Sequence, residues 1–246
     1  MMDVSSARYG SSTELFRAVG LSKRYAEERA IADVTFSVTP GEVLGIVGPN
    51  GAGKTTLLEL VAGLVAADSG SISWRGEELQ PSRRKAAMFY LPDGVRPYQD
   101  RFAADVMAFF ARVYRRSDAD LRAIISALGL APALRKRVYA LSKGYNRRLL
   151  LAVGLLTPQQ ALLMDEPFDG FDLRQTRCII YLVRNEAAKG RTFILAIHQL
   201  ADAERVCDRF ILLAGGKVRG IGSLDELRSQ AGMPKGSLEE IFLALT

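Results

Sequence analysis

The chain has 246 residues, of which 48% are hydrophobic and 24% are charged. This is the composition of a globular protein, and it excludes a largely disordered or fibrous chain. Two cysteines cannot build a disulfide framework, so we expect a reducing, cytoplasmic compartment. The apolar runs are far shorter than the ~20 residues that a membrane-spanning helix needs, and the first residues lack the apolar centre of a signal peptide. We therefore expect a protein that is soluble or that attaches peripherally to another component.

The net charge of +6 is distributed unevenly. Residues 81–148 contain 15 lysines and arginines against 5 aspartates and glutamates, whereas the rest of the chain contains 18 against 22. A basic middle segment suits anionic lipid, nucleic acid or an acidic partner. A solvated, arginine-rich helical surface gives the same pattern, so charge alone does not choose between these interpretations.

The first third of the chain predicts strands around one glycine-rich loop. Residues 1–13 are rich in serine and are expected to be disordered. Residues 16–38 predict short strands joined by turns, and residues 43–48 form an apolar run typical of a strand buried on both faces. After the glycine-rich loop, residues 55–64 predict a helix, and residues 69–79 predict a turn and a short strand.

A helical segment interrupts the strand pattern in the middle of the chain. Apolar residues recur at helical spacing in residues 101–116. Ser117 then begins a second helix, with Asp120 three residues later as its capping partner and Gly129 at its end. We therefore expect a helical insert over approximately residues 96–157.

The strand pattern returns in the last third of the chain. Residues 161–167 and 192–198 are apolar runs that end in polar groups, and residues 209–222 predict a hairpin that turns at Gly215 and Gly216. Two short helices are expected over residues 224–230 and 238–245. Strands that alternate with helices predict an α/β fold with a mostly parallel sheet, in which ligands bind at the carboxyl ends of the strands.

The loop GPNGAGKTT predicts a phosphate-binding site. It matches G-x-x-x-x-G-K-[ST], follows a predicted strand and opens a predicted helix, which is the setting that this motif requires. Glycines allow consecutive backbone N–H groups to converge on phosphate oxygens, and the N-terminus of the helix adds positive potential. Lys54 is expected to reach the β- and γ-phosphates, and the Thr55 hydroxyl is expected to bind Mg²⁺. The expected phosphate-binding residues are Gly48, Pro49, Asn50, Gly51, Ala52, Gly53, Lys54, Thr55 and Thr56.

Polar side chains follow the two later apolar runs. Asp165 is expected to hold the metal or its water, and Glu166 beside it is expected to polarise an attacking water. His198, the one histidine in the chain, follows the second run. A neutral imidazole there can hydrogen-bond the γ-phosphate or the attacking water. Strands also end in polar residues for solubility alone, but the nearby phosphate loop favours a functional role for all three.

A second polar turn precedes the acidic strand, in LSKGYNRRLLLAVGLL at residues 141–156. Ser142 and Gly144 stand there at the start of an apolar helix. A hydroxyl, a glycine amide and a helix N-terminus can form a second phosphate-binding corner, and they can equally be an ordinary helix cap.

Taken in order, these motifs resemble the ATP-binding cassette (ABC) ATPases, and specifically the nucleotide-binding subunits of ABC transporters. The resemblance extends from about residue 16 to about residue 222. It depends on the phosphate loop at 48–56, LSKGY at 141–145 as the signature, the strand ending at Glu166, GFD at 170–172 as the D-loop, His198 as the switch histidine, and Tyr25 where the family stacks an aromatic ring on adenine.

The resemblance implies a fold and two cofactors. The fold would be a P-loop NTPase core with a mostly parallel sheet, an antiparallel β subdomain and a helical insert. Residues 14–232 would form the ATPase domain, with the helical subdomain at approximately 96–157, and residues 233–246 would form a C-terminal helix. The cofactors would be ATP and Mg²⁺.

The resemblance also implies a mechanism. Two subunits sandwich two ATP molecules head to tail, as a homodimer or a heterodimer, so Ser142 and Gly144 would touch the γ-phosphate bound by the partner. Glu166 would be the general base, and His198 would hold the γ-phosphate end. Hydrolysis removes the bridging γ-phosphate and opens the dimer, which drives a separate transmembrane permease. The subunit would lie on the cytoplasmic face of the cell membrane.

Three places depart from the family pattern. In the signature, commonly LSGGQ, Lys143 and Tyr145 replace glycine and glutamine. Asp93, in YLPDG, stands where the family has glutamine or sometimes glutamate, so its expected contact with Mg²⁺ is weaker or mediated by water. Asp169 stands in the D-loop where serine is commoner. We predict hydrolysis that is real but slow without the partner.

Three functions compete. An exporter subunit is favoured because the ending SLEEIFLALT resembles the tails of exporter subunits that have a separate permease. A non-transport ABC protein that acts on ribosomes or nucleic acid is left open by the basic segment, although such proteins usually carry two cassettes or a long coiled-coil insert. A small P-loop kinase or GTPase leaves LSKGY unexplained, and the NKxD motif of GTPases is absent. Binding to nucleic acid is disfavoured, because neither a second cassette nor a long coiled-coil insert is present in the sequence.

Overall fold

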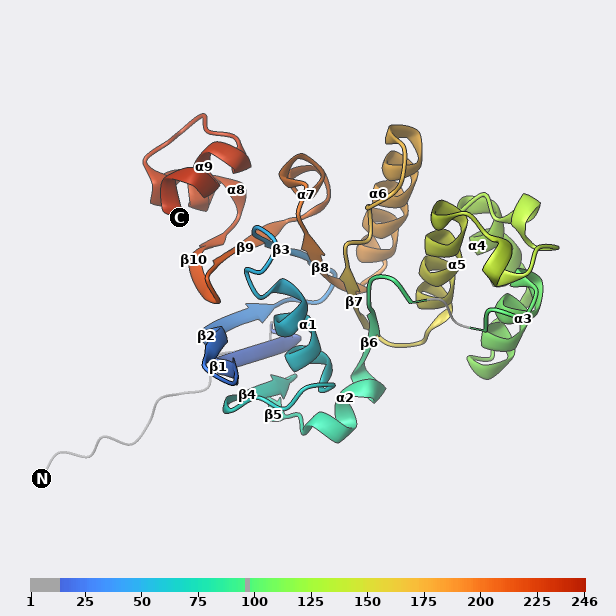
Figure 1. The fold of residues 1–246 in the computed structure, drawn as a ribbon, viewed down its shortest axis with the longest axis horizontal. Coiled ribbons are helices and arrows are strands. Elements are labelled where there is room, and N and C mark those ends of the chain that lie inside the picture. The colour runs from blue at the N-terminus through green and yellow to red at the C-terminus, as the bar shows by residue number, and fades with distance from the viewer. Residues whose placement is uncertain (1–13, 96–97) are drawn as a thin grey trace, which may run out of the picture.

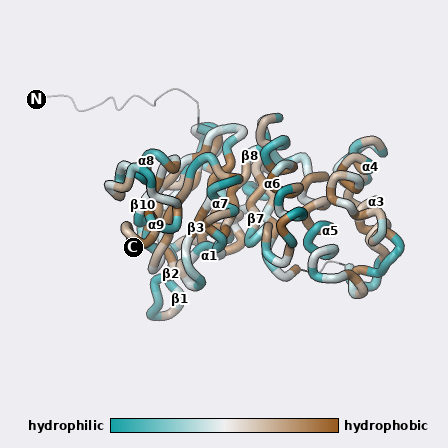
Figure 2. Tube along the Cα trace, turned by 90° about the horizontal axis from the view of Figure 1, so that it is seen from above, coloured by the Kyte–Doolittle hydropathy of each residue, from teal (hydrophilic) through white to brown (hydrophobic). Residues whose placement is uncertain are grey.

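The computed structural model describes residues 14–95 and 98–246, which form two sheets and a helical region (Figure 1). The expected disorder of residues 1–13 lies outside the described residues. The part with both sheets and the part with α3 (Ala103–Val113), α4 (Asp118–Ala127) and α5 (Lys143–Leu156) lie side by side along the long axis, as the view from above also shows (Figure 2). The expected α/β architecture, with an antiparallel subdomain and a helical insert, is confirmed.

The antiparallel sheet begins with the first two strands of the chain. β1 (Phe16–Tyr25) pairs with β2 (Glu28–Val38) and β4 (Ser69–Trp74), and β5 (Glu77–Glu78) completes the order β2-β1-β4-β5. The expectation of short strands over residues 16–38 is wrong, because β1 and β2 are 10 and 11 residues long. Register shifts along this pair interrupt the two-residue period, so each strand resembles several shorter pieces in the sequence.

A second, mostly parallel sheet has the order β10-β9-β3-β8-β7-β6. Its strands are β3 (Val43–Val47), β6 (Met88–Leu91), β7 (Ala161–Asp165), β8 (Thr192–Ile197), β9 (Arg209–Ala214) and β10 (Lys217–Gly222). β3, β7 and β8 are buried at every residue, which explains their continuous apolar runs. β9 and β10 pair antiparallel and form the expected hairpin.

The two faces of this sheet contribute to two different cores. Met164 of β7 packs in the core that contains α6 (Leu173–Ala188), α7 (Leu200–Val206) and the helical region. Its neighbour Leu163 packs in the core that contains α1 (Lys54–Ala62) and the antiparallel sheet. This alternation follows from strand geometry, in which successive side chains point to opposite faces. α1 therefore packs between the two sheets.

Within the described residues, the helical region contains three α-helices and two short 3-10 turns. They are α3 (Ala103–Val113), α4 (Asp118–Ala127), the turns Ala131–Ala133 and Val138–Ala140, and α5 (Lys143–Leu156). The capping box predicted at Ser117 is confirmed. α5 packs on α3 and α4 and also on β6. The helix that begins in the LSKGY segment therefore links the helical region to the parallel sheet.

Several elements have no counterpart in the sequence predictions, namely α2 (Pro81–Ala87), β6, α6 and α7. The two expected C-terminal helices are confirmed as α8 (Leu224–Ala231) and α9 (Leu238–Leu245), each of which begins with a capping box. No helix in the described part of the chain combines the length and the apolar character needed to cross a membrane.

Candidate functional site

The phosphate loop joins β3 to α1 and depends on two glycines. Gly53 has a φ of +102°, and a Cβ there would lie 2.5 Å from the carbonyl oxygen of Ala30. A Cβ on Gly48 would lie 2.1 Å from the carbonyl oxygen of Leu213. No side chain fits at such distances, so the loop packs on β2 and β9 through bare backbone. It ends at the N-terminus of α1, where free N–H groups and the helix dipole favour an anion.

The Lys54 ammonium lies inside this loop. The residue is buried, and its Nζ donates to the carbonyl oxygens of Gly48 and Pro49 at 2.8 and 3.2 Å. The Oε1 atom of Glu166 lies 3.7 Å from the same nitrogen. The loop backbone therefore holds a cation whose charge faces the acidic end of β7, where it can bind an anionic group by charge-assisted hydrogen bonds.

Thr55 and Asp165 bring a hydroxyl and a carboxylate together at the carboxyl end of β7. Thr55 Oγ1 donates to Asp165 Oδ2 at 2.7 Å, although the two residues are 110 positions apart in the chain. Burial raises the pKa of Asp165, the hydrogen bond from Thr55 opposes this shift, and the charges of Glu166 and Asp93 raise the pKa further. A nearby cation would therefore stabilise the ionised form of Asp165.

Glu166 and His198 meet because they directly follow β7 and β8, which are neighbouring parallel strands. Oε2 of Glu166 contacts Nδ1 of His198 and accepts a hydrogen bond from the His198 N–H at 3.3 Å. Glu166 has a φ of 49°, which is uncommon outside glycine, and its N–H donates to the carbonyl oxygen of Ala196 at 3.0 Å. The structure thus brings the two expected catalytic side chains together, while their roles stay predictions.

A cavity of about 620 Å³ opens over these groups, a volume in the range of small-molecule sites. Its lining residues are Tyr25, Glu28, Ala30, Asn50, Gly51, Gly53, Lys54, Thr55, Thr56, Glu59, Tyr90, Pro92, Asp93, Asp165 and Glu166. Most of the expected nucleotide-binding residues are among them. Gly48, Pro49 and Ala52 belong to the same loop but do not line the cavity. Tyr25, at the end of β1, is 46% exposed, so its ring is accessible there.

Five lining residues have no counterpart among the expected ones: Glu28, Ala30, Glu59, Tyr90 and Pro92. Within the described residues, the buried hydroxyl of Tyr90 has no hydrogen-bond partner. Burial raises the pKa of Tyr90, and the charges of Asp165 and Glu59 add to the shift. A buried, unpaired hydroxyl is a donor that a polar ligand can satisfy. The sequence signal that could have identified Tyr90 is its position as the first residue of YLPDG.

Ser142 and Gly144 do not line this cavity. Ser142 is exposed and caps α5, and its hydroxyl oxygen accepts a hydrogen bond from the Tyr145 N–H at 3.3 Å. A Cβ on Gly144 would meet nothing closer than the carbonyl oxygen of Gly170, at 3.8 Å. Within one copy of the chain, the second polar turn is therefore an exposed helix N-terminus beside the GFD segment.

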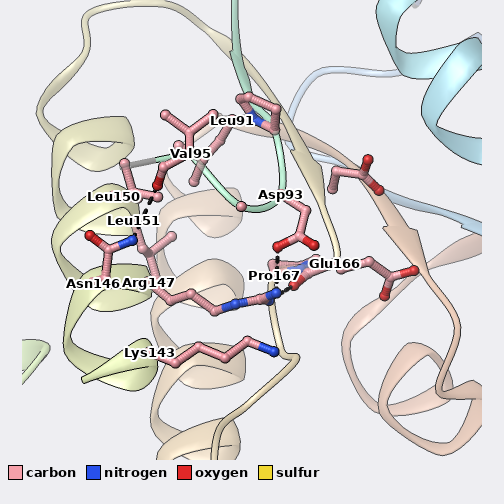
Figure 3. Close-up of a pocket in the computed structure, with 13 residues that line it drawn as sticks. Leu91, Asp93, Val95, Lys143, Asn146, Arg147, Leu150, Leu151, Glu166 and Pro167 are labelled. Carbon is pink, nitrogen blue, oxygen red and sulfur yellow. Dashed lines mark hydrogen bonds and ion pairs between the residues drawn. The ribbon is translucent and has the colours of Figure 1, made fainter. Parts of the chain in front are cut away.

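Asp93 lines the cavity, but Arg147 of α5 binds its carboxylate. Arg147 Nη2 lies 2.5 Å from Asp93 Oδ1 and 3.0 Å from Asp169 Oδ2. Lys143 Nζ lies 2.7 Å from the same Asp169 oxygen. Figure 3 shows the Arg147 side chain extending from α5 toward Asp93 and Glu166. The expected Mg²⁺ contact of Asp93 stays a prediction, and the structure adds a cationic partner that the sequence motifs do not indicate.

Comparison with known proteins identifies the family. The sequence model of the family described as ABC transporter matches residues 31–169. A fluoroquinolones export ATP-binding protein of Mycobacterium tuberculosis is 35% identical over 232 residues, which cover 92% of this chain and 75% of that protein. The chain belongs to the ABC transporter family.

Two further similarities agree with this assignment to the ABC transporter family. The Nod factor export ATP-binding protein I of Rhizobium etli is 32% identical over 228 residues, which cover 88% of this chain and 71% of that protein. A solved structure of an ATP-binding subunit of an ABC transporter has a TM-score of 0.86 and 30% identity, and the match covers 94% of this chain and 99% of the other. Membership implies ATP binding and ATP hydrolysis.

The end of β7 in this ABC protein fits Mg²⁺. Mg²⁺ prefers oxygen ligands and is commonly held by one or two carboxylates together with substrate phosphates and waters. The Thr55 hydroxyl and the Asp165 carboxylate are such ligands, and they already lie in contact beside the phosphate loop. The glycine cradle at Gly48 and Gly53, which a Cβ would fill, fits the phosphates themselves.

Proposed function

We propose that this protein is the ATP-binding and ATP-hydrolysing subunit that energises an ABC exporter through a separate transmembrane permease. The observation that carries the proposal is the single cavity in which the phosphate loop, Thr55, Asp165 and Glu166 converge, with His198 in contact with Glu166. The similarity to proteins named for the export of fluoroquinolones and Nod factor supports the direction of transport.

ATP binding would use the whole length of the cavity. The N–H groups of the phosphate loop and the N-terminus of α1 would hold the phosphates, and Lys54 would bind the β- and γ-phosphates. The exposed ring of Tyr25 would stack on the adenine. Thr55 and Asp165 would hold Mg²⁺, directly or through water, and the bound ion would supply neutralisation of the phosphate charge.

Hydrolysis would use the carboxylate of Glu166 as general base. Glu166 would take a proton from the attacking water while the water oxygen bonds to the γ-phosphorus and the bond to the bridging oxygen of ADP breaks. The products are ADP and inorganic phosphate. His198 would orient the Glu166 carboxylate that it contacts and would hydrogen-bond the γ-phosphate.

The second phosphate-binding corner would act across a dimer. Ser142 is exposed and lies at the N-terminus of α5, outside the cavity of its own chain. In a head-to-tail dimer, Ser142 and Gly144 would reach the γ-phosphate held by the partner, so ATP would join the two copies and hydrolysis would release them.

The helical region would contact the permease on the cytoplasmic face of the membrane. It exposes several large apolar side chains near one another in the chain, with Tyr98 53%, Phe102 43% and Phe109 44% exposed. Tyr98 and Phe109 are in ring contact, with their centroids 5.9 Å apart. Exposed apolar groups of this kind mark protein-binding surfaces.

Two measurements test the proposal. Purified protein with ATP and Mg²⁺ should release phosphate, and Glu166→Gln should abolish release while ATP still binds. Glu77→Gln, at an exposed position on β5, is the matched control and should keep the wild-type rate. Tagged Glu166→Gln protein with ATP and Mg²⁺ should co-purify a multi-span membrane protein from detergent-solubilised cells. Co-purified ribosomes, or a wild-type rate in Glu166→Gln, would contradict the proposal.

A further inference from the structure

Arg147 of α5 joins two segments that lie far apart in the chain, the loop after β6 and the segment after β7. It belongs to α5, and only 11% of its side chain is exposed. Its Nη1 donates to the backbone carbonyl oxygen of Glu166, and its Nη2 lies between Asp93 Oδ1 and Asp169 Oδ2 at 2.5 and 3.0 Å. The planar guanidinium is well suited to bind several oxygens at once in fixed directions. One side chain of the helical region thus contacts the loop after β6 and the segment that follows β7.

The charges around Arg147 are balanced. Lys143, one turn earlier on α5, binds Asp169 at 2.7 Å, so two cations on the helix face two carboxylates on the core. The hydrogen bond from Lys143 and the nearby charges of Arg147 and Lys143 hold the pKa of Asp169 below its usual value. We call these residues, Asp93, Lys143, Arg147 and Asp169, the charge cluster.

A small cavity of about 130 Å³ lies beside the charge cluster, between α5 and the ends of β6 and β7 (Figure 3). Asn146 of α5 donates across it to the carbonyl oxygen of Val95 at 3.1 Å. Figure 3 shows Asn146 and Arg147 reaching from the same helix to two points of the loop after β6. α5 is therefore bound to the loop after β6 by a neutral hydrogen bond from Asn146 and by an ion pair from Arg147.

The backbone of Glu166 depends on the same cluster. Its left-handed conformation must be held by neighbouring groups, because it is unfavourable for a residue with a Cβ. The carbonyl oxygen of Glu166 accepts from Arg147 and from the Asp169 N–H, and the second bond is long, at 3.3 Å. Without Arg147, that carbonyl would keep only the long bond. The backbone that sets the direction of the Glu166 side chain would then be held by fewer hydrogen bonds.

We propose that Arg147 is a positioning residue for ATP hydrolysis, which fixes the backbone of Glu166 through the charge cluster. The inference depends on the proposed role of Glu166 as general base. It also gives Asp93, Lys143 and Asp169 one shared role, because Asp93 and Asp169 bind Arg147 and Lys143 binds Asp169.

Kinetics of three variants test this inference. In Arg147→Gln, kcat should fall on the order of 10- to 100-fold, as expected when a catalytic group is displaced by about 1 Å, while KM for ATP and the affinity for ATP stay within about twofold. Arg147→Lys keeps the charge and should recover part of kcat. Arg122→Gln, at an exposed position on α4, is the matched control and should behave as wild type.

Glu166→Gln in the same assay separates the two proposals. If Glu166→Gln is inactive and Arg147→Gln retains kcat within about twofold of wild type, the positioning role is overturned and the base assignment stands. If Glu166→Gln hydrolyses ATP at the wild-type rate, the base assignment fails, and the positioning role fails with it. A loss in Arg147→Gln that appears in KM with kcat unchanged also overturns the positioning role.

Asp169→Asn provides a second route should Arg147→Gln fail to fold. It keeps Arg147 and its bond to Glu166 but removes one of the two carboxylates that anchor the guanidinium. A reduced kcat with an unchanged KM supports the inference. An unchanged kcat in this variant, at a melting temperature equal to that of wild type, overturns it.

Discussion

Thr55 and Asp165 connect the phosphate loop directly to the acidic strand, through a 2.7 Å hydrogen bond between Oγ1 and Oδ2. Thr55 stands in the first turn of α1, and Asp165 ends β7. The bond therefore sets the position of α1 relative to the parallel sheet at the point where phosphates and Mg²⁺ are proposed to bind. It also gives the buried carboxylate of Asp165 a donor, which opposes the effect of burial on its pKa.

Thr55→Val should weaken Mg²⁺-dependent ATP binding. Valine keeps the branched shape but removes the hydroxyl, so the proposed metal loses a ligand and Asp165 loses its hydrogen-bond donor. We expect the affinity for ATP with Mg²⁺ to fall on the order of 10-fold, as for other changes in the ligand environment of a metal. Titration of a fluorescent ATP analogue in Mg²⁺ and in EDTA measures this. Equal losses of affinity in both buffers would contradict a role of Thr55 at the metal.

Asp165→Asn should stabilise the nucleotide-free protein. Burial raises the pKa of Asp165 in the folded state, so the ionised carboxylate opposes folding above this raised pKa, and the opposition is lost as the pH falls through it. Removal of the charge should raise the melting temperature at pH 8 on the order of 2–4 °C, which corresponds to about 1 kcal/mol for a chain of this size. Differential scanning calorimetry measures the shift.

The pH dependence gives the control for Asp165→Asn. As the pH falls through the raised pKa of Asp165, the wild-type carboxylate gains its proton in the folded state before it does so in the unfolded state, so the difference in melting temperature between the two proteins should narrow. The variant should also lose the extra stabilisation that Mg²⁺ adds to ATP binding. A difference that widens toward low pH would show that the carboxylate stabilises the fold.

Arg191→Met should destabilise the protein by about 2–3 kcal/mol, because the carbonyl oxygens of Leu155 and Gln159 lose the donor that the structure gives them. The last carbonyl groups of a helix have no partner within the helix. Arg191, with 14% of its side chain exposed, donates to the carbonyl oxygens of Leu155, Gly154 and Thr157 at 2.9, 3.2 and 3.2 Å at the end of α5. Arg116 donates to the Thr157 carbonyl as well, at 2.8 Å, so part of the end remains satisfied.

Urea unfolding monitored by circular dichroism measures the effect of Arg191→Met. Arg177→Met, at an exposed position on α6, is the control and should change the free energy of unfolding by no more than about 0.5 kcal/mol. If both variants unfold at the same urea concentration, the buried hydrogen bonds of Arg191 contribute nothing measurable to the free energy of unfolding.

The strands and the phosphate loop are predictable because their signals are local. β7 and β8 are buried at every residue, so each is a continuous apolar run. The phosphate loop combines glycines, a lysine and hydroxyls within nine residues, and its backbone geometry needs these types in this order. α6 carries a similar local signal, since Thr176, Ile179 and Val183 are buried at helical spacing, although the predicted elements do not include this helix.

The charge cluster is not predictable in this way. Arg147, Asp93 and Asp169 come from three segments, and the pairs that they form are 54 and 22 residues apart. No periodicity or motif connects them, and only the chain fold places the start of α5 over the ends of β6 and β7. The sequence does contain a hint, since Asp93 and Asp169 depart from the residues that are commoner there in the family that the motifs resemble, and a carboxylate in a partly buried place needs a cation.

Gly53→Ala should damage the phosphate loop more than Gly51→Ala does, although both glycines have a positive φ. A Cβ on Gly51, at φ +79°, meets nothing within 4 Å, whereas one on Gly53, at φ +102°, meets the Ala30 carbonyl oxygen at 2.5 Å and Ile31 Cδ1 at 2.8 Å. Gly51→Ala should cost only the left-handed backbone, about 1–2 kcal/mol. Gly53→Ala must also move the loop away from β2.

For Gly53→Ala we expect a larger loss of stability than for Gly51→Ala, and on the order of 100-fold weaker ATP binding because the displaced N–H groups no longer converge on the phosphates. Urea unfolding and ATP titration of the pair measure both effects. Equal losses in the two variants would show that the backbone conformation, and not the contact with β2, makes glycine necessary at position 53.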